Sequence, residues 1–209
     1  ISRITSIIDT SMLRYFLLLM TSNIRQPLTR FVLIHTNHNG NVGAAARAMK
    51  VMGFDELVLV DPRDAKVLNR DKTKHGASGA DDVLQKTRIC ASVEEALQGV
   101  DHVCATGMPH SMQLSRPEQT YQAPRQFFAD LLEKETEEVR IAFLFGNERY
   151  GMRPEDIDMC ETVLGIPTNP EFGSLNLASA VQLVAYDWRE AIGGFSMDDA
   201  RSEGDSIGE

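Results

Sequence analysis

The sequence has 209 residues, of which 43% are hydrophobic and 24% are charged. These proportions suit one globular domain and exclude a disordered or collagen-like chain. A formal net charge of -9 argues against nucleic acid, whose binding proteins usually carry a basic footprint. The charge is uneven, however, because residues 1–90 hold 13 basic and 8 acidic side chains whereas residues 91–209 hold 8 and 22. The basic half leaves RNA binding open.

Composition also divides the chain into three segments. Residues 1–30 are predicted to form a partly flexible N-terminal extension, because the apolar run 12–20 is interrupted by Arg14 and is too short to span a bilayer. Residues 31–192 are predicted to form the domain. Residues 193–209 hold five acids and one arginine, which predicts a solvated acidic tail. We therefore expect no membrane partner.

From residue 31 onward, short apolar runs alternate with helical stretches. Buried strands are predicted at 31–35, 57–60, 103–106, 141–145 and 163–166. Helices are predicted at 42–52, near 80–85, from 92 to about 97, and at 124–134, 154–160 and 175–192. Asn41 and Gly53 are expected to bound the first helix, and 63–74 to be a basic, polar connection. This alternation predicts an α/β fold with a mostly parallel sheet flanked by helices.

The three cysteines, Cys90, Cys104 and Cys160, lie far apart in the sequence. No CxxC pair and no Cys/His cluster at zinc spacing is present, so we expect no metal. Free cysteine packs as a small hydrophobic residue. We therefore expect all three in the core of a cytoplasmic protein.

The segment 39–46 follows a strand and opens a helix, the position of the glycine fingerprint in dinucleotide-binding folds. Asp61 lies roughly where a ribose-binding acid is expected. The first glycine of the fingerprint falls on His38, however, which does not make the required tight turn as easily. An NAD-dependent oxidoreductase remains an alternative.

Polar residues gather in three places along the chain. Arg47 lies in the second turn of the first helix, where it is either a solvated surface side chain or a functional one. Glu148 follows the most apolar strand, at whose carboxyl end a ligand crevice is expected, although a surface turn also fits. Ser174 can act as an N-cap of the last helix, and Asn176 is an unusual choice for a first helical turn.

Together these segments resemble the SpoU-type RNA 2′-O-ribose methyltransferases of the SPOUT superfamily. The similarity covers about residues 31–192 and consists of three motifs in order, Asn41-x-Gly-Ala-Ala-Ala-Arg47, Phe145-Gly-Asn-Glu148-x-x-Gly151 and Ile166-Pro-x6-Ser174-Leu-Asn176-Leu-Ala. Each motif alone is weak, whereas all three in order are specific. The first motif and the following Leu-Val-Leu-Val-Asp-Pro run are most similar to bacterial enzymes that methylate ribose 32 of tRNA.

The resemblance implies a C-terminal trefoil knot, S-adenosylmethionine as cofactor, RNA (tRNA above all) as substrate, and a homodimer. Methylation of rRNA or of another tRNA position is the alternative. The resemblance implies that these residues are catalytic: Arg47, Asn41, Glu148, Ser174 and Asn176. It implies that these bind the cofactor: Thr106, Gly107, Met108, Gly146, Ile166, Gly173, Ser174 and Leu175.

Three further expectations accompany the resemblance. Arg47 acts on the ribose 2′-hydroxyl either as a base or as a clamp, and the lasting positive charge of arginine side chains favours the clamp. RNA contacts are expected from the basic residues Arg47, Lys50, Arg63, Lys66, Arg70, Lys72 and Lys74. The dimer contact is expected at Met49, Met52 and the last helix, and a helical extension found in similar tRNA enzymes is expected to be missing after residue 209.

Overall fold

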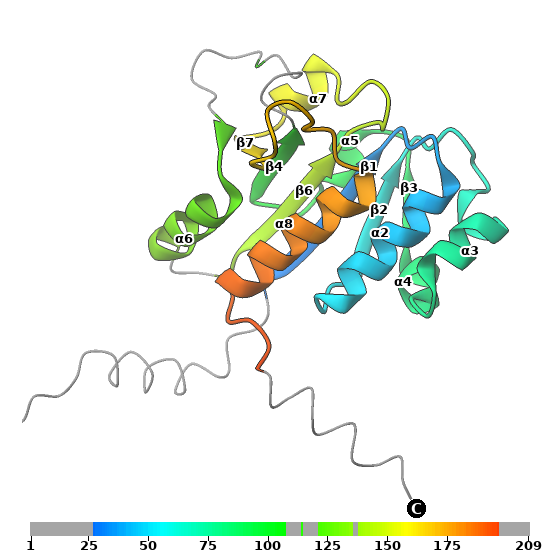
Figure 1. Cartoon of the computed structure of the whole chain (residues 1–209), viewed down its shortest axis with the longest axis horizontal. Coiled ribbons are helices and arrows are strands. Elements are labelled where there is room, and N and C mark those ends of the chain that lie inside the picture. The colour runs from blue at the N-terminus through cyan, green and yellow to red at the C-terminus, as the bar shows by residue number, and fades with distance from the viewer. Residues whose placement is uncertain (1–26, 108–113, 115–120, 136–137, 197–209) are drawn as a thin grey trace, which may run out of the picture.

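The computed structural model describes residues 27–107, 114, 121–135 and 138–196 (Figure 1). The expectations for residues 1–26, for Met108 and for the tail beyond residue 196 lie outside the described residues.

A parallel sheet forms the centre of the described chain, with the strand order β3-β2-β1-β6-β4-β7-β5. Its strands are β1 Leu28–Ile34, β2 Glu56–Val60, β3 Arg88–Cys90, β4 His102–Gly107, β5 Tyr121–Gln122, β6 Arg140–Phe145 and β7 Thr162–Gly165. The predicted α/β fold with a mostly parallel sheet is confirmed. The two strands missed by the sequence analysis, β3 and β5, are the short edge strands.

Helices cover both faces of the sheet. They are α2 Asn39–Val51, α3 Asp71–Ala77, α4 Asp81–Lys86, α5 Val93–Ala96, α6 Pro124–Lys134, α7 Pro154–Asp158 and α8 Leu177–Ala191, with a short 3₁₀ helix, η1, at Val67–Asn69. Helices α2 and α8 lie side by side across one face, flanked by α6 and by α3 and α4 (Figure 1). Helices α5 and α7 pack on the opposite face. No helix of the described residues has the length and apolar character needed to cross a bilayer.

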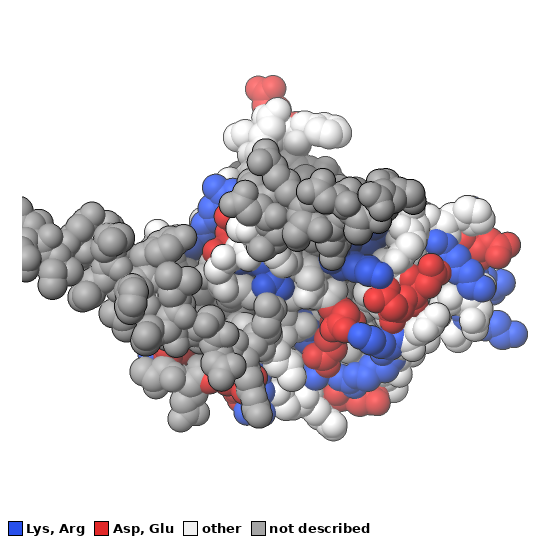
Figure 2. Space-filling model, turned by 90° about the horizontal axis from the view of Figure 1, so that it is seen from below, with Lys and Arg blue, Asp and Glu red and all other residues white. Residues whose placement is uncertain are grey.

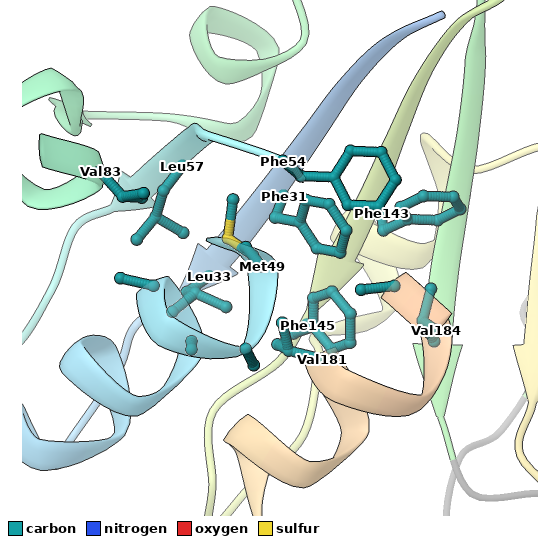
Figure 3. Close-up of a cluster of buried hydrophobic side chains, with 14 of the residues drawn as sticks. Phe31, Leu33, Met49, Phe54, Leu57, Val83, Phe143, Phe145, Val181 and Val184 are labelled. Atoms are coloured by element: carbon teal, nitrogen blue, oxygen red, sulfur yellow. The ribbon is translucent and has the colours of Figure 1, made fainter. Parts of the chain in front are cut away.

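The larger hydrophobic cluster fills the space between the sheet and the α2–α8 pair (Figure 3). Phe31 and Phe143 of the sheet meet Met49 of α2 and Val184 of α8 there, and each of the four is fully buried. Burying a side chain of this size stabilises the fold by about 1.5–3 kcal/mol. Met49 therefore belongs to the core, and its prediction as a dimer contact is wrong.

The segment 63–74 is not a simple connection, because it contains η1 and the start of α3. Thr73 is fully buried, and its hydroxyl donates to the carbonyl oxygens of Val67 (2.6 Å) and Asn39 (3.1 Å). A mostly polar stretch therefore has one buried side. The buried residue Thr73 is polar and is satisfied by backbone carbonyls, so an apolar periodicity does not reveal the start of α3.

Helices α2 and α3 approach so closely that only glycine fits between them. A Cβ atom added to Gly43 of α2 would lie 1.9 Å from the carbonyl oxygen of Thr73, and one added to Gly76 of α3 would lie 2.7 Å from that of Gly40. Both neighbours are backbone atoms. The contact therefore fixes α3 against the first turns of α2.

The three cysteines are buried, as predicted. Burial raises the pKa of the Cys104 thiol well above its ordinary value, and it also raises the pKa of Cys90. Both thiols are therefore poor nucleophiles at neutral pH.

Candidate functional site

A cavity of about 660 Å³ opens at the carboxyl edge of strands β4, β6 and β7. Ligands of parallel α/β sheets bind in this kind of place, outside the carboxyl ends of the strands. The loops after the three strands and the first turns of α7 and α8 form its walls. The described lining residues are Thr106, Gly107, Phe145, Gly146, Asn147, Glu148, Arg149, Tyr150, Gly151, Met152, Pro154, Ile157, Ile166, Thr168, Ser174, Leu175, Leu177 and Ala180.

The cavity brings together predicted site residues that lie far apart in the sequence. Those that line it are Thr106, Gly107, Gly146, Glu148, Ile166, Ser174 and Leu175. Gly173 adjoins this set without lining the cavity, and Met108 lies outside the described residues. Asn41, Asn176 and Arg47 are not among the described lining residues.

Asn41 and Asn176 join Glu148 in one hydrogen-bonded network. The Glu148 carboxylate accepts hydrogen bonds from the backbone N–H groups of Asn37 (2.8 Å) and His38 (3.2 Å) and from the Asn41 amide (2.9 Å). The Asn41 amide oxygen in turn accepts a hydrogen bond of 3.1 Å from the Asn176 amide. The network therefore connects the three sequence motifs through side chains.

The network keeps Glu148 ionised. Partial burial raises the pKa of its carboxyl group, but the hydrogen bonds from the Asn37 N–H and the Asn41 amide outweigh burial and hold the pKa below its ordinary value. A negative charge therefore sits beside the start of α2 and at the wall of the cavity at neutral pH.

Two helix starts differ from their predictions. Helix α2 begins at Asn39, so Asn41 lies inside the first turn, and His38 at the N-cap forms no side-chain cap bond. The Asn41 amide is thereby available for Glu148. Helix α8 begins at Leu177 and is capped by Asn176, whose side-chain oxygen accepts from the N–H of Ala178 (2.9 Å). The N-cap role predicted for Ser174 is therefore wrong.

The turn after β6 is held closed by its own backbone and by Asn147. Asn147 and Gly151 exchange two backbone hydrogen bonds of 2.9 Å. The Asn147 side-chain oxygen accepts from the N–H groups of Arg149 (2.9 Å) and Tyr150 (3.1 Å). A Cβ atom on Gly146 would lie only 2.4 Å from the Gly151 carbonyl carbon. The sequence analysis missed Asn147, although an asparagine directly after a buried strand is a turn signal.

Arg47 is not part of this network. It lies six positions after Asn41 on α2, which is about 9 Å along a helix axis. Its side chain is exposed, and it forms no hydrogen bond or ion pair with another described residue. The guanidinium is therefore available to an external partner.

Some of the predicted RNA-contacting cations are already paired. Lys50 forms an ion pair of 2.7 Å with Asp82, and Arg70 binds Asp64 through two hydrogen bonds of 2.6 and 3.1 Å. The Arg70 guanidinium lowers the pKa of Asp64 to about 2, so this pair stays charged. The remaining predicted cations are exposed and without a side-chain partner among the described residues: Arg47, Arg63, Lys66, Lys72 and Lys74.

At the opposite end of the molecule, two cations of the described residues are paired with acids. Seen from below, at the amino ends of the strands, the visible Lys and Arg side chains are interspersed with Asp and Glu (Figure 2). Arg140 pairs there with Asp101 at 2.7 Å, and Lys86 pairs with Asp55. The unpaired cations predicted to contact RNA lie on α2, on α3 and in the loop after β2. Within the described chain they are therefore nearer the carboxyl edge of the sheet.

The start of α2 is poorly suited to a dinucleotide. Gly43 packs against α3 and does not face a ligand. The backbone N–H groups of Asn37 and His38 already bind the Glu148 carboxylate, whose negative charge repels a pyrophosphate. No group of His, Cys, Asp and Glu side chains suited to a metal ion is present in the described part of the chain.

Comparisons with known proteins agree with this geometry. The sequence matches the SpoU rRNA Methylase family over residues 29–186. It is 40% identical over 167 residues to the tRNA (cytidine/uridine/adenosine-2'-O-)-methyltransferase TrmJ of Pseudomonas aeruginosa, covering 78% of this chain and 60% of that protein. The chain thus spans less than two thirds of the length of the curated relatives compared with it, 60% to 64% in three of them.

Solved structures of high similarity include two methyltransferases. TrmJ from Z. mobilis superposes with a TM-score of 0.68 at 35% identity, covering 85% of this chain and 75% of that chain. A probable methyltransferase from Bordetella pertussis superposes with a TM-score of 0.70 at 35% identity, covering 79% and 95%. Motif order, fold and a match over most of the sequence therefore lead to one conclusion: the chain belongs to the SpoU rRNA methylase family.

Proposed function

We propose that this protein transfers the methyl group of S-adenosylmethionine to a ribose 2′-hydroxyl of RNA, with nucleotide 32 of tRNA as the target. The cavity carries the proposal, because segments from β4, from the Gly146–Gly151 turn and from the segment before α8 converge on it. The names of the relatives, tRNA 2'-O-methyltransferases, support tRNA as the substrate. The family description names rRNA, which is the second candidate.

The residues around the cavity fit S-adenosylmethionine. A volume of about 660 Å³ lies within the usual range of small-molecule sites, roughly 300–1,000 Å³. Ile166, Leu175 and Leu177 offer apolar surface to a planar base, while the ionised Glu148 favours a positively charged sulfonium. When bound, S-adenosylmethionine supplies a methyl group that is activated by its attachment to positive sulfur.

Arg47 is the residue that we assign to the ribose. An arginine guanidinium carries a lasting positive charge and offers only N–H donors. It therefore donates hydrogen bonds to the 2′-oxygen as negative charge develops there, or to an adjacent phosphate. The Glu148–Asn41–Asn176 network fixes the first turn of α2 relative to the cavity and so determines where Arg47 is presented.

A homodimer completes the site in this proposal. Arg47 does not line the described cavity of its own chain, so it is assigned to the cavity of a second copy. Exposed apolar side chains suited to such a contact lie on the outer surfaces of α2 and α8: Val51, Leu183 and Tyr186. The trefoil knot and a cytoplasmic location, where tRNA is available, belong to the same proposal.

Exposed cations supply the RNA-binding charge. Arg63 and Lys66 lie in the loop after β2, and Lys72 and Lys74 lie on α3, which packs against the first turns of α2. Each phosphate contact releases counterions, so the affinity falls steeply as salt rises. We therefore expect binding of tRNA to be strongly salt-dependent despite a formal net charge of -9.

Calorimetry and a methyl-transfer assay test the proposal together. We expect S-adenosylmethionine, and not NAD, to bind, and we expect methyl transfer to an unmodified tRNA transcript. Arg47→Ala should abolish transfer while leaving cofactor affinity unchanged. Arg125→Ala is the matched control, because Arg125 is also an exposed helical arginine and pairs with Asp187 on α8. Binding of NAD alone, or normal turnover by Arg47→Ala, would overturn the proposal.

A further inference from the structure

Tyr150 presents a large aromatic ring to solvent at the wall of the cavity. The side chain lines the cavity, yet 76% of the residue's surface is exposed. By contrast Met152, two residues further along the same turn, is 8% exposed and packs into the core. The ring is therefore available to a ligand at the mouth of the cavity and contributes little to the fold.

The backbone that carries the ring is held in a defined turn. The backbone N–H of Tyr150 donates to the Asn147 side chain (3.1 Å), and the turn is closed on both sides by the Asn147–Gly151 hydrogen bonds. The Arg149 guanidinium lies 5.3 Å from the centre of the Tyr150 ring, within the range of a cation–π contact. The turn therefore fixes where the Tyr150 and Arg149 side chains leave the backbone, and the two side chains lie side by side.

An exposed aromatic ring beside an arginine is suited to an unstacked nucleobase. Proteins that recognise single-stranded RNA stack bases on aromatic rings and on guanidinium planes, while phosphates bind the positive charge. Tyr150 follows Glu148 by two residues, so a base resting on it lies next to the proposed site of methyl transfer. The stacked base would therefore belong to the methylated nucleotide or to the nucleotide next to it.

We propose that Tyr150, supported by Arg149, stacks on a nucleobase of the RNA substrate and positions the target ribose. The inference rests on the proposed function and deepens it by naming a positioning residue that recognises a base. The adenine of the cofactor is the competing partner for the ring. Tyr150 lies at the rim of the cavity with 76% of its surface exposed. A cofactor enclosed by the cavity would leave the ring uncovered, whereas RNA bound over the mouth of the cavity would cover it, which favours the RNA.

A fluorescence titration tests the contact without any need for methyl transfer. Trp188 is the single tryptophan of the chain and is fully buried, so a Tyr150→Trp variant adds one exposed reporter. We expect unmodified tRNA to quench the fluorescence of this variant beyond the wild-type change, and S-adenosylmethionine alone to leave it unquenched. Quenching by the cofactor alone, or no quenching by tRNA, would overturn the proposal.

Affinity measurements on two further variants complete the test. Tyr150→Ala should weaken binding of tRNA and raise its KM about 5- to 150-fold, the range given by loss of one base–aromatic stack. Tyr150→Phe retains the ring and should restore both values, and calorimetry should give the same S-adenosylmethionine affinity for all three proteins. If Tyr150→Ala leaves tRNA affinity unchanged, or weakens the cofactor instead, the inference is wrong. A protein that binds tRNA through Tyr150 without methylating it would contradict the proposed function alone.

Discussion

Replacing Gly43 by alanine tests how α2, which carries Asn41 and Arg47, is held in place. The added Cβ atom would lie 1.9 Å from the Thr73 carbonyl oxygen, 2.7 Å from the Ala77 nitrogen and 2.9 Å from the Thr73 carbonyl carbon. All three neighbours are backbone atoms of α3. No side-chain rotation relieves the overlap, so α3 has to move away from α2.

Two opposing terms set the size of the effect. Alanine gains about 1 kcal/mol over glycine inside a helix. Overpacking typically costs about 1–3 kcal/mol, and a contact of 1.9 Å with rigid backbone places this site at or above the upper end. We therefore expect the free energy of unfolding to fall by about 2 kcal/mol, which lowers Tm by about 4–8 °C for a chain of this size.

Gly40→Ala is the matched control, three residues earlier in the same helix. Its added Cβ atom would lie 4.0 Å from the Lys72 carbonyl oxygen, which is an ordinary contact. We expect Gly40→Ala to leave Tm unchanged or to raise it by a few degrees through helix propensity. Thermal and urea unfolding followed by circular dichroism measure both variants. Equal stabilisation by the two substitutions would refute the close α2–α3 contact.

Three further predictions concern the network, the turn and the core. Glu148→Gln should lower the free energy of unfolding by about 1–3 kcal/mol at neutral pH, because the neutral amide leaves N–H donors poorly paired. Folding lowers the pKa of Glu148, so the extra stability of the wild type over Glu148→Gln should be complete above pH 4.5, the ordinary pKa of a glutamate. In urea unfolding this difference should disappear as the pH falls through the lowered pKa. A difference that grew on acidification would contradict the lowered pKa. Gly146→Ala should reduce S-adenosylmethionine affinity at least about tenfold in calorimetry, since its Cβ would lie 2.5 Å from the Met152 nitrogen and open the turn. Trp188→Phe removes the hydrogen bond of 2.8 Å to Thr29 and part of a buried ring. The free energy of unfolding, measured in urea, should fall by about 2–3 kcal/mol. A fall below about 0.5 kcal/mol would show that the site repacks.

Much of the fold could be predicted from the sequence because its main elements are long and strongly patterned. The apolar runs at the centre of the sheet are buried on both faces, and α6 has proline in its first turn and the bounds expected for it. Strands β3 and β5 have three and two residues, too few to show any periodicity. Helix α3 is stabilised by contact with α2 rather than by an apolar face of its own.

The sequence indicates which residues belong to the candidate site but not the hydrogen bonds that join them. Asn41 has the residue type of an N-cap, and local preference cannot reveal a carboxylate 107 positions later in the chain. Ser174 and Asn176 both have N-cap preference, and only the observed start of α8 distinguishes them. Tyr150 gives no signal in the sequence, because its exposure beside the cavity depends on the closed turn that presents it.

The most direct test of the central claim is the chemical position of the transferred methyl group. The protein is incubated with methyl-labelled S-adenosylmethionine and an unmodified tRNA transcript, and the RNA is digested to nucleosides and analysed by mass spectrometry. We predict label in a 2′-O-methylated ribonucleoside, located at position 32 by fragment mapping, and no label with the Arg47→Ala variant. Label on a nucleobase, or no label on tRNA from a protein that binds S-adenosylmethionine, would contradict the account.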